Sequence, residues 1–176
     1  MLDRLPDIIK VQSLAETGRV LEGKLSLASM QRLGLQLAEG ADNANEAEVT
    51  LEFGIDVQSI KFLSGHIVAP VKMTCQRCMG TMDYTVDIRI KLAMIKSEEE
   101  AEELPDRYEP LLVNEPELSL VELIEEELML ALPIVALHEN DDCPAATVDN
   151  GLQGTQPIET EGKPNPFVVL AQLKNK

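Results

Sequence analysis

Three segments in the N-terminal part of the chain alternate regularly between apolar and polar side chains. The alternation runs through residues 48–57, 67–73 and 82–94, where apolar side chains recur at every second position. A period of two is typical of a β-strand that buries one face and exposes the other. The pattern therefore predicts an antiparallel sheet as the body of the molecule.

The residues before these segments favour a strand, a short helix and a loop. A strand is expected over residues 20–27. Ser29 is a suitable N-cap for a short helix that continues to Leu37. Residues 39–46 are polar, and we interpret them as a loop.

A helix is expected over residues 119–132. Ser119 and Glu122 have the spacing of a capping box, and Pro133 would end the helix. Its charged positions Glu122, Glu125 and Glu126 are expected to face water. Residues 97–103 could form one or two helical turns, before Pro105 and Pro110 interrupt regular structure. The apolar stripe of the longer helix consists of Leu120, Leu123, Ile124, Leu128 and either Ala131 or Leu132.

Together these elements predict an α+β fold. An antiparallel sheet, open or barrel-like, is joined to a C-terminal acidic helical segment and a short tethered C-terminal helix. We place one α+β domain at residues 1–143, sheet-rich over 1–96 and acidic and helical over 97–143. Residues 144–163 are interpreted as a flexible linker and 164–176 as a helical tail. This tail, with Asn165 and Pro166 at its start, would dock on its own body or on a partner.

The negative charge of the chain is concentrated in one segment. The formal net charge is −16, and residues 97–150 contain 17 acidic side chains against one basic side chain, Arg107. Such a segment repels phosphate and attracts cationic partners, unless it is only a solvated surface. A protein rich in Lys and Arg is the kind of partner it suits, and the tail would add an apolar anchor. The candidate partner-binding residues are Glu98, Glu99, Glu100, Glu102, Glu103, Phe167 and Leu170.

A Cys-x-x-Cys motif lies between two of the expected strands. Cys75 and Cys78 would therefore occupy a hairpin tip, where two thiolates can hold one side of a tetrahedral zinc ion. His138 and Cys143 are the best candidates for the other two ligands, which makes a structural zinc the implied cofactor. Two alternatives stay open at this point: partly buried reduced thiols, or a redox pair.

Several functional classes lack support in the sequence. No apolar run is long enough for a membrane helix, and the start of the chain lacks a signal peptide, so we expect a cytoplasmic protein with no membrane partner. No catalytic triad, phosphate-binding glycine loop or Walker lysine is present, so we expect neither an enzyme nor a small-molecule substrate. Lys and Arg are scattered and the few aromatic residues form no stacking array, which argues against direct RNA binding.

Several motifs occur in a characteristic order, at residues 75–78, 104–110, 113–115, 128–133, 138, 143, 163–167 and 170–174. In this order they resemble the YceD family of large ribosomal RNA subunit accumulation proteins. The resemblance implies a role in the synthesis, processing or stability of 23S ribosomal RNA and no established enzyme activity. Some relatives have a second cysteine pair where this chain has His138 and Cys143.

Three functions are therefore compared with the structure. The first is a non-catalytic adaptor that holds a basic large-subunit protein or an assembly intermediate. The second is a factor that binds 23S ribosomal RNA directly. The third is a thiol protein that uses the Cys-x-x-Cys motif.

Overall fold

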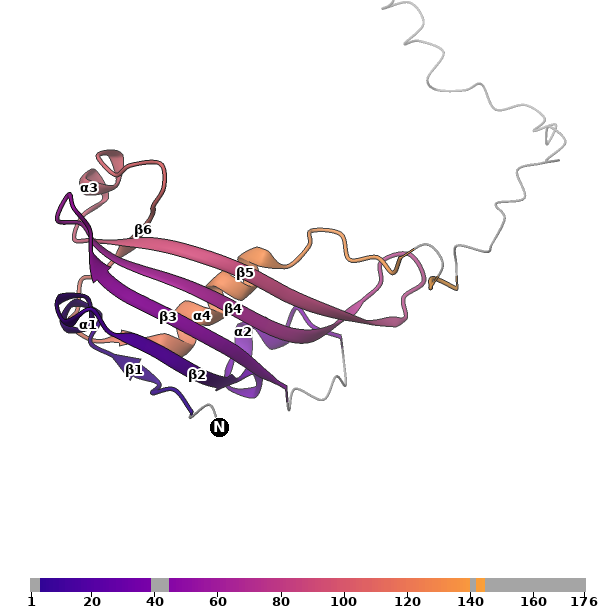
Figure 1. Cartoon of the computed structure of the whole chain (residues 1–176). Coiled ribbons are helices and arrows are strands. Elements are labelled where there is room, and N and C mark those ends of the chain that lie inside the picture. Colours follow the sequence, from indigo (N-terminus) through magenta and orange to yellow (C-terminus); the bar gives the residue numbers. More distant parts are fainter. Residues whose placement is uncertain (1–3, 39–44, 140–141, 145–176) are drawn as a thin grey trace, which may run out of the picture.

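The body of the protein is a curved five-stranded sheet that lies against helices (Figure 1). The computed structural model describes residues 4–38, 45–139 and 142–144. The strands follow one another in the order β2-β3-β4-β5-β6, and the pairings from β2 to β5 are antiparallel. Only the last pairing, of β5 with β6, is parallel. The strands are β2 (Val20–Ser26), β3 (Glu46–Ile55), β4 (Lys61–Thr74), β5 (Thr81–Ile95) and β6 (Glu109–Leu112).

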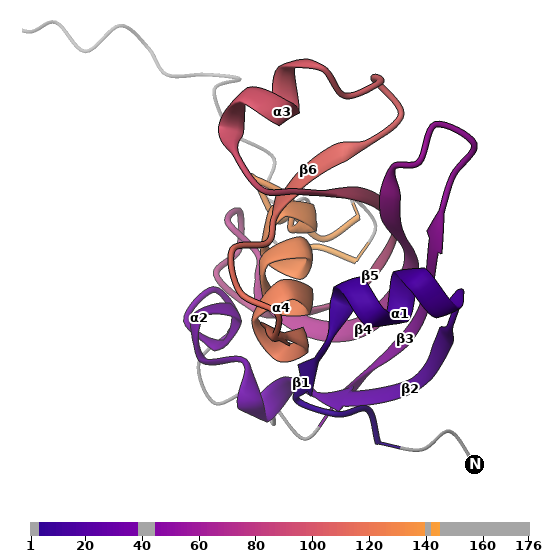
Figure 2. The same cartoon turned by 90° about the vertical axis from the view of Figure 1, so that its left-hand side faces the viewer.

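The expected α+β fold with an antiparallel sheet is confirmed, and the sheet is open rather than barrel-like. In the described part of the chain, its edge strands β2 and β6 do not pair with each other. The sheet curves around helix α4 (Leu120–Ala131), which occupies the concave side (Figure 2). The helix thus fills the space across which the two edges would have to meet.

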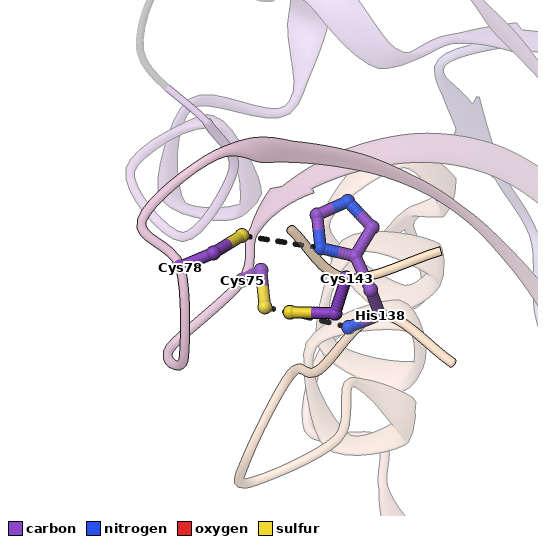
Figure 3. A group of neighbouring side chains, drawn as sticks. All are labelled: Cys75, Cys78, His138 and Cys143. Atoms are coloured by element: carbon purple, nitrogen blue, oxygen red, sulfur yellow. Dashed lines mark hydrogen bonds between the residues drawn. The ribbon is translucent and has the colours of Figure 1, made fainter. Parts of the chain in front are cut away.

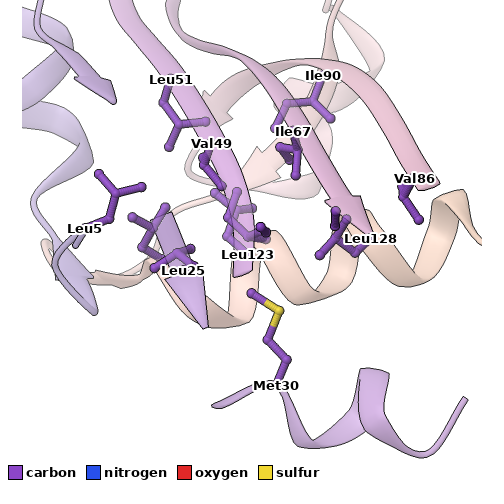
Figure 4. Close-up of a cluster of buried hydrophobic side chains, with 14 of the residues drawn as sticks. Leu5, Leu25, Met30, Val49, Leu51, Ile67, Val86, Ile90, Leu123 and Leu128 are labelled. Atoms are coloured by element: carbon purple, nitrogen blue, oxygen red, sulfur yellow. The ribbon is translucent and has the colours of Figure 1, made fainter. Parts of the chain in front are cut away.

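The alternating pattern sets which face of the sheet is buried. Ala47, Val49, Leu51 and Phe53 of β3 are all buried, whereas the glutamates between them are exposed. The same alternation continues in β4 and β5, and Val49 lies opposite Ile67 in the register. These inward side chains meet Leu123 and Leu128 of α4 in one core (Figure 4).

Strand β4 is longer than the pattern predicted because Gly65 interrupts the apolar alternation without interrupting the strand. A Cβ atom at Gly65 would lie 2.7 Å from Leu51 Cδ2 and 3.0 Å from Ile90 Cγ1. The neighbouring strands therefore fill the position that an apolar side chain would have occupied. Gly65 is therefore required by close packing in the core and not by a turn of the backbone.

Helix α4 begins and packs as predicted, with one correction. Ser119 Oγ accepts a hydrogen bond from the Glu122 amide at 3.2 Å, and the apolar stripe from Leu120 to Leu128 is buried. Glu125, however, does not face water: its residue is only 5% exposed. Its Oε1 accepts hydrogen bonds from the backbone amides of Arg32 at 2.6 Å and Leu33 at 3.0 Å.

Those two amides belong to helix α2 (Gln31–Gly34), and they explain why Glu125 is buried. The first amides of a helix have no partner within the helix, so a carboxylate from α4 satisfies them. The predicted cap was wrong, because Ser29 lies in a 3₁₀ turn (Leu27–Ser29) and its hydroxyl donates to the Ser26 carbonyl at 2.6 Å. Helix α2 is also shorter than the expected helix to Leu37.

The N-terminal segment packs on the sheet and on the start of α4. Helix α1 (Val11–Thr17) contacts β3 and β4, and Val11 and Ala15 are buried. Strand β1 (Ile8–Ile9) pairs antiparallel with β7 (Leu118–Ser119), immediately before α4. The sequence pattern did not predict this pairing.

The acidic segment contains helix α3 (Glu98–Glu102), as the sequence led us to expect. Strand β6 includes Pro110, although proline was expected to break regular structure there. Proline is tolerated in this place because β6 is an edge strand, where not every backbone amide has a partner strand.

Several predictions fall outside the described residues. These are the loop after residue 38, nearly all of the linker, and the tail with Asn165, Pro166, Phe167 and Leu170. The division of the chain at residues 143 and 163 stays a prediction. Within the described ranges, none of the helices has the length and apolar character needed to cross a membrane.

Candidate metal centre and acidic groove

The tip of the β4–β5 hairpin presents Cys75 and Cys78 on one side. The amide of Cys75 donates to the Gly80 carbonyl, and the amide of Met79 donates to the Cys75 carbonyl, each at 2.8 Å. The chain reverses at Met79, which has a φ of 60°. Cys78 Sγ accepts a hydrogen bond from the Gly80 amide at 3.4 Å. The predicted hairpin position of the motif is therefore confirmed.

The segment that follows α4 brings the other two residues to this tip (Figure 3). The Gln76 amide donates to the Ala136 carbonyl at 2.8 Å, and the His138 amide donates to Cys75 Sγ at 3.4 Å. Cys75 and Cys143 are buried, while Cys78 and His138 are partly exposed. One potential ligand atom from each of the four lies within 4.8 Å of all the others.

This arrangement fits a tetrahedral metal ion. Zinc bonds of about 2.3 Å to sulfur and 2.0 Å to nitrogen place neighbouring ligand atoms roughly 3.5–3.8 Å apart. Cys78 Sγ and His138 Nδ1 are 3.4 Å apart, and the widest separation between ligand atoms would have to shrink by at most about 1 Å. His138 Nε2 lies 3.2 Å from the Thr81 carbonyl oxygen. Such a contact orients the ring and leaves Nδ1 free to bind a metal.

The environment also favours a thiolate at Cys75. Burial alone would raise the pKa of this thiol, but hydrogen bonds from the backbone amides of His138, Cys78 and Arg77 lower the pKa to about 5. The Gly80 amide lowers the pKa of Cys78, yet burial and the neighbouring Cys75 and Cys143 leave that pKa raised. A bound metal ion would favour the thiolate form of Cys78 as well, because metal binding requires deprotonated thiols.

Three sulfur atoms and one imidazole nitrogen form a donor set that can hold a metal. The structure brings together the four residues that the sequence singled out, Cys75, Cys78, His138 and Cys143. A redox pair of the thioredoxin type would open a helix after a strand. Here Cys75 and Cys78 instead lie between two strands.

The predicted partner-binding glutamates lie elsewhere. Glu98, Glu99, Glu100, Glu102 and Glu103 are all exposed on or next to α3. Helix α3 follows the end of β5, whereas the cysteine pair precedes its start, so the two sites occupy opposite ends of the sheet (Figure 1). Phe167 and Leu170 fall outside the described residues.

The structure contains an acidic groove that sequence reasoning missed. It lies between α4 and β6 and has a volume of about 550 Å³. Its charged lining consists of Glu109, Glu126 and Glu127, together with one cation, Arg32. Its apolar wall includes Leu111, Met129 and the largely exposed Leu130. Burial raises the pKa of Glu127, and repulsion from Glu109 and Glu126 raises it further.

The sequence gives little local signal for this groove. Glu109 and Glu127 belong to elements that are close in the chain, β6 and α4, but β6 was not expected as a strand. An exposed leucine on the polar side of α4, Leu130, is the one hint that this helix faces more than solvent.

Comparison with known proteins places these features in a family. Residues 63–174 match the family described as "Large ribosomal RNA subunit accumulation protein YceD". A protein of that name from Haemophilus influenzae is 36% identical over 143 residues, which cover 80% of this chain and 82% of the relative. No solved structure matches the chain. The matched region includes the four-residue cluster and both walls of the acidic groove.

Proposed function

This chain belongs to the YceD family, and from that premise we propose that it promotes the accumulation of 23S ribosomal RNA as a non-catalytic adaptor. In this role it would hold a basic large-subunit protein, or an assembly intermediate that contains one. The family supports the process, and the acidic groove is the observation that supports the adaptor mechanism.

The groove suits a cationic side chain next to an apolar one. Within the described residues, Glu109 and Glu127 have no cationic partner, whereas Glu126 pairs with Arg32 at 3.3 Å. A lysine or arginine of the partner would relieve the repulsion that raises the pKa of Glu127. An adjacent apolar side chain would cover Leu130. A phosphate group in the same place would increase the repulsion.

The exposed glutamates of α3 would act at longer range. Charges of one sign on an exposed surface speed the encounter with an oppositely charged partner, and salt screens this effect. The tail would then contribute Phe167 and Leu170 as an apolar contact that salt does not weaken. In this scheme, α3 accelerates association and the groove and tail slow dissociation.

The cysteine cluster would hold a structural zinc ion in the same mechanism. Cys75 and Cys78 would bind it from the hairpin, and His138 and Cys143 from the segment after α4. Such a site supplies folding free energy and no reaction, because all four positions are taken by protein ligands. It would fasten the chain that follows α4 to the sheet and so steady the helix that forms one wall of the groove.

Complementation of a deletion strain tests this proposal. Loss of the gene should lower 23S relative to 16S ribosomal RNA and reduce large subunits on a sucrose gradient. The wild-type gene should restore the ratio, while a Glu109→Gln, Glu127→Gln variant should not. A Glu115→Gln, Glu122→Gln variant removes the same charge from exposed positions outside the groove and serves as the control.

The direct partner distinguishes the competing mechanisms. Affinity purification at low salt should recover a basic protein with the wild type and with the control, but less of it with the groove variant. Recovery of RNA alone would favour direct RNA binding. An unchanged ribosomal RNA ratio after deletion, under slow growth and in the cold, would contradict the proposed process itself.

A further inference from the structure

A second surface, on the outer face of the sheet, combines an aromatic ring with positive charge. Leu63 and Ile67 of β4 point into the core, so the alternating residues Phe62, Ser64 and His66 point to the opposite face. Two hollows of about 540 and 740 Å³ lie on this face. Phe62 and Lys91 line both hollows, which therefore adjoin and form what we call the outer trough.

Phe62 is held as a platform in the middle of the trough. The far end of its ring lies over Gly54, where a Cβ atom would be only 2.8 Å from Phe62 Cζ. The ring centroid of Tyr108 lies 6.2 Å away, with the two ring planes inclined by 32°. Gly54 and Tyr108 thus support Phe62 from below and from the side. Phe62 itself is only partly buried and is accessible from the trough.

Cationic side chains surround this platform. Lys91 Nζ lies 5.0 Å and Arg107 Cζ 4.9 Å from the centroid of the Tyr108 ring, and Arg89 lines the next part of the trough. Arg107 is neutralised by Asp56 at 2.9 Å. In the described ranges, Arg89 and Lys91 form no ion pair, although the chain carries a net charge of −16.

Glu52 lines the same hollow, but among the described residues no carboxylate forms an ion pair with Arg89 or Lys91. In the strand register Glu52 lies opposite Ser64, which in turn lies opposite Lys91, so a whole strand separates the two charges. Asp87 accepts from His66 Nε2 at 2.8 Å. Arg89 and Lys91 are two residues apart on one face, which places them roughly 6.8 Å apart along the strand. This spacing is comparable to the step between successive phosphates of an extended single strand.

We propose that the outer trough binds a short single-stranded RNA segment, with one base against Phe62 and neighbouring phosphates at Arg89 and Lys91. An aromatic platform flanked by unpaired cations is the combination that binds single strands without sequence preference. An acidic peptide would satisfy the cations but would leave the ring face unused. The trough lies on the face of the sheet opposite α4, so RNA binding there is independent of the acidic groove and goes beyond the proposed adaptor role.

Fluorescence anisotropy with an end-labelled oligouridine tests this inference on the full-length protein. Two phosphate contacts predict a slope of about −1.4 for log affinity against log salt, or an affinity loss of about sevenfold between roughly 50 and 200 mM salt. Arg89→Gln with Lys91→Gln should bring the slope close to zero. Phe62→Leu should weaken binding about tenfold without changing the slope, and Phe62→Tyr should retain wild-type affinity.

A control variant distinguishes RNA binding in the outer trough from a general effect of positive charge on the protein. Lys10→Gln with Lys24→Gln removes two cations that already pair with glutamates, at 3.7 and 3.4 Å, and should leave binding unchanged. Equal weakening by this control would overturn the proposal, as would no detectable binding by the wild type at about 10⁻³ M, well above the usual range for phosphate contacts. Thermal melting confirms that each variant is folded. Competition by an acidic peptide as strong as by RNA, insensitive to Phe62→Leu, would instead identify a protein-binding surface.

Discussion

Replacement of Glu125 by alanine should be one of the most damaging single changes in α4. The carboxylate accepts hydrogen bonds from the backbone amides of Arg32 and Leu33 in α2. Leu33 is fully buried. A buried donor left without an acceptor costs about 1–3 kcal/mol, and the partly exposed amide of Arg32 should cost less. We therefore expect Glu125→Ala to lower the free energy of unfolding by about 3 kcal/mol.

Two neighbouring substitutions isolate the cause. Glu126→Ala removes an exposed carboxylate that pairs with Arg32, and it should lower the free energy of unfolding by less than about 1 kcal/mol. Arg32→Ala also should cost below about 1 kcal/mol, because its guanidinium lies 3.6 Å from Glu125 and is 53% exposed, while its backbone amide remains. Glu125→Gln keeps an acceptor oxygen and should fall between these values and the alanine variant.

Urea denaturation with zinc present throughout measures these differences. For a slope of about 2 kcal/mol per molar urea, the alanine variant should unfold at roughly 1.5 M less urea than the wild type. Equal effects of Glu125→Ala and Glu126→Ala would refute a capping role for the buried carboxylate. If Arg32→Ala proved as costly as Glu125→Ala, the ion pair rather than the backbone amides would carry the stabilisation.

Three further predictions concern metal, pH and partner binding. Zinc should co-purify at about one ion per chain and be lost in a Cys75→Ser, Cys78→Ser variant; elemental analysis that finds no metal in protein made with ample zinc would contradict the site. Burial raises the pKa of Asp56, but the Ile60 amide, Arg107, Tyr108 and the Gln58 amide lower it to about 2. Because this folded-state pKa lies below the unfolded value, the stabilisation is complete above about pH 4 and is lost as pH falls toward 2, so Asp56→Asn should flatten the stability profile in that window. Replacing Glu98, Glu99, Glu100, Glu102 and Glu103 with Gln should slow association with a basic large-subunit protein in binding kinetics, while Phe167→Ala mainly speeds dissociation. Tight binding of naked 23S fragments, unimproved by the Gln variant, would contradict this division.

Local patterns in the sequence predicted much of the fold. Strict alternation predicted the central strands because one buried face requires an apolar side chain at every second position. The Ser119 cap and the apolar stripe of α4 were equally local and were confirmed. The cysteine cluster was predictable because few side chains bind soft metals, so His138 and Cys143 were the natural partners for the Cys-x-x-Cys pair.

The remaining features depend on contacts between distant residues. Glu125 was expected to face water because its partners, the amides of α2, lie more than ninety positions earlier in the chain. The acidic groove depends on strand β6, which was not predicted because Pro110 suggested an interruption of regular structure. The outer trough depends on Gly54, Phe62 and Tyr108 meeting across strands, whereas their spacing along the chain suggested scattered aromatic residues.

The pairing of β1 with β7 has a consequence for the newly made chain. Ile8 and Ile9 are made more than a hundred residues before their partners, Ser119 and Leu118. The hairpins of β2 to β5 can form as soon as they emerge, because each strand pairs with its neighbour in sequence. Helix α1 covers part of their apolar inner face, but the main cover, α4, is made only after β7. A nascent chain that stalled before Leu118 would thus present a formed sheet without its main helical cover. Aggregation or chaperone capture would compete most strongly with folding in this interval.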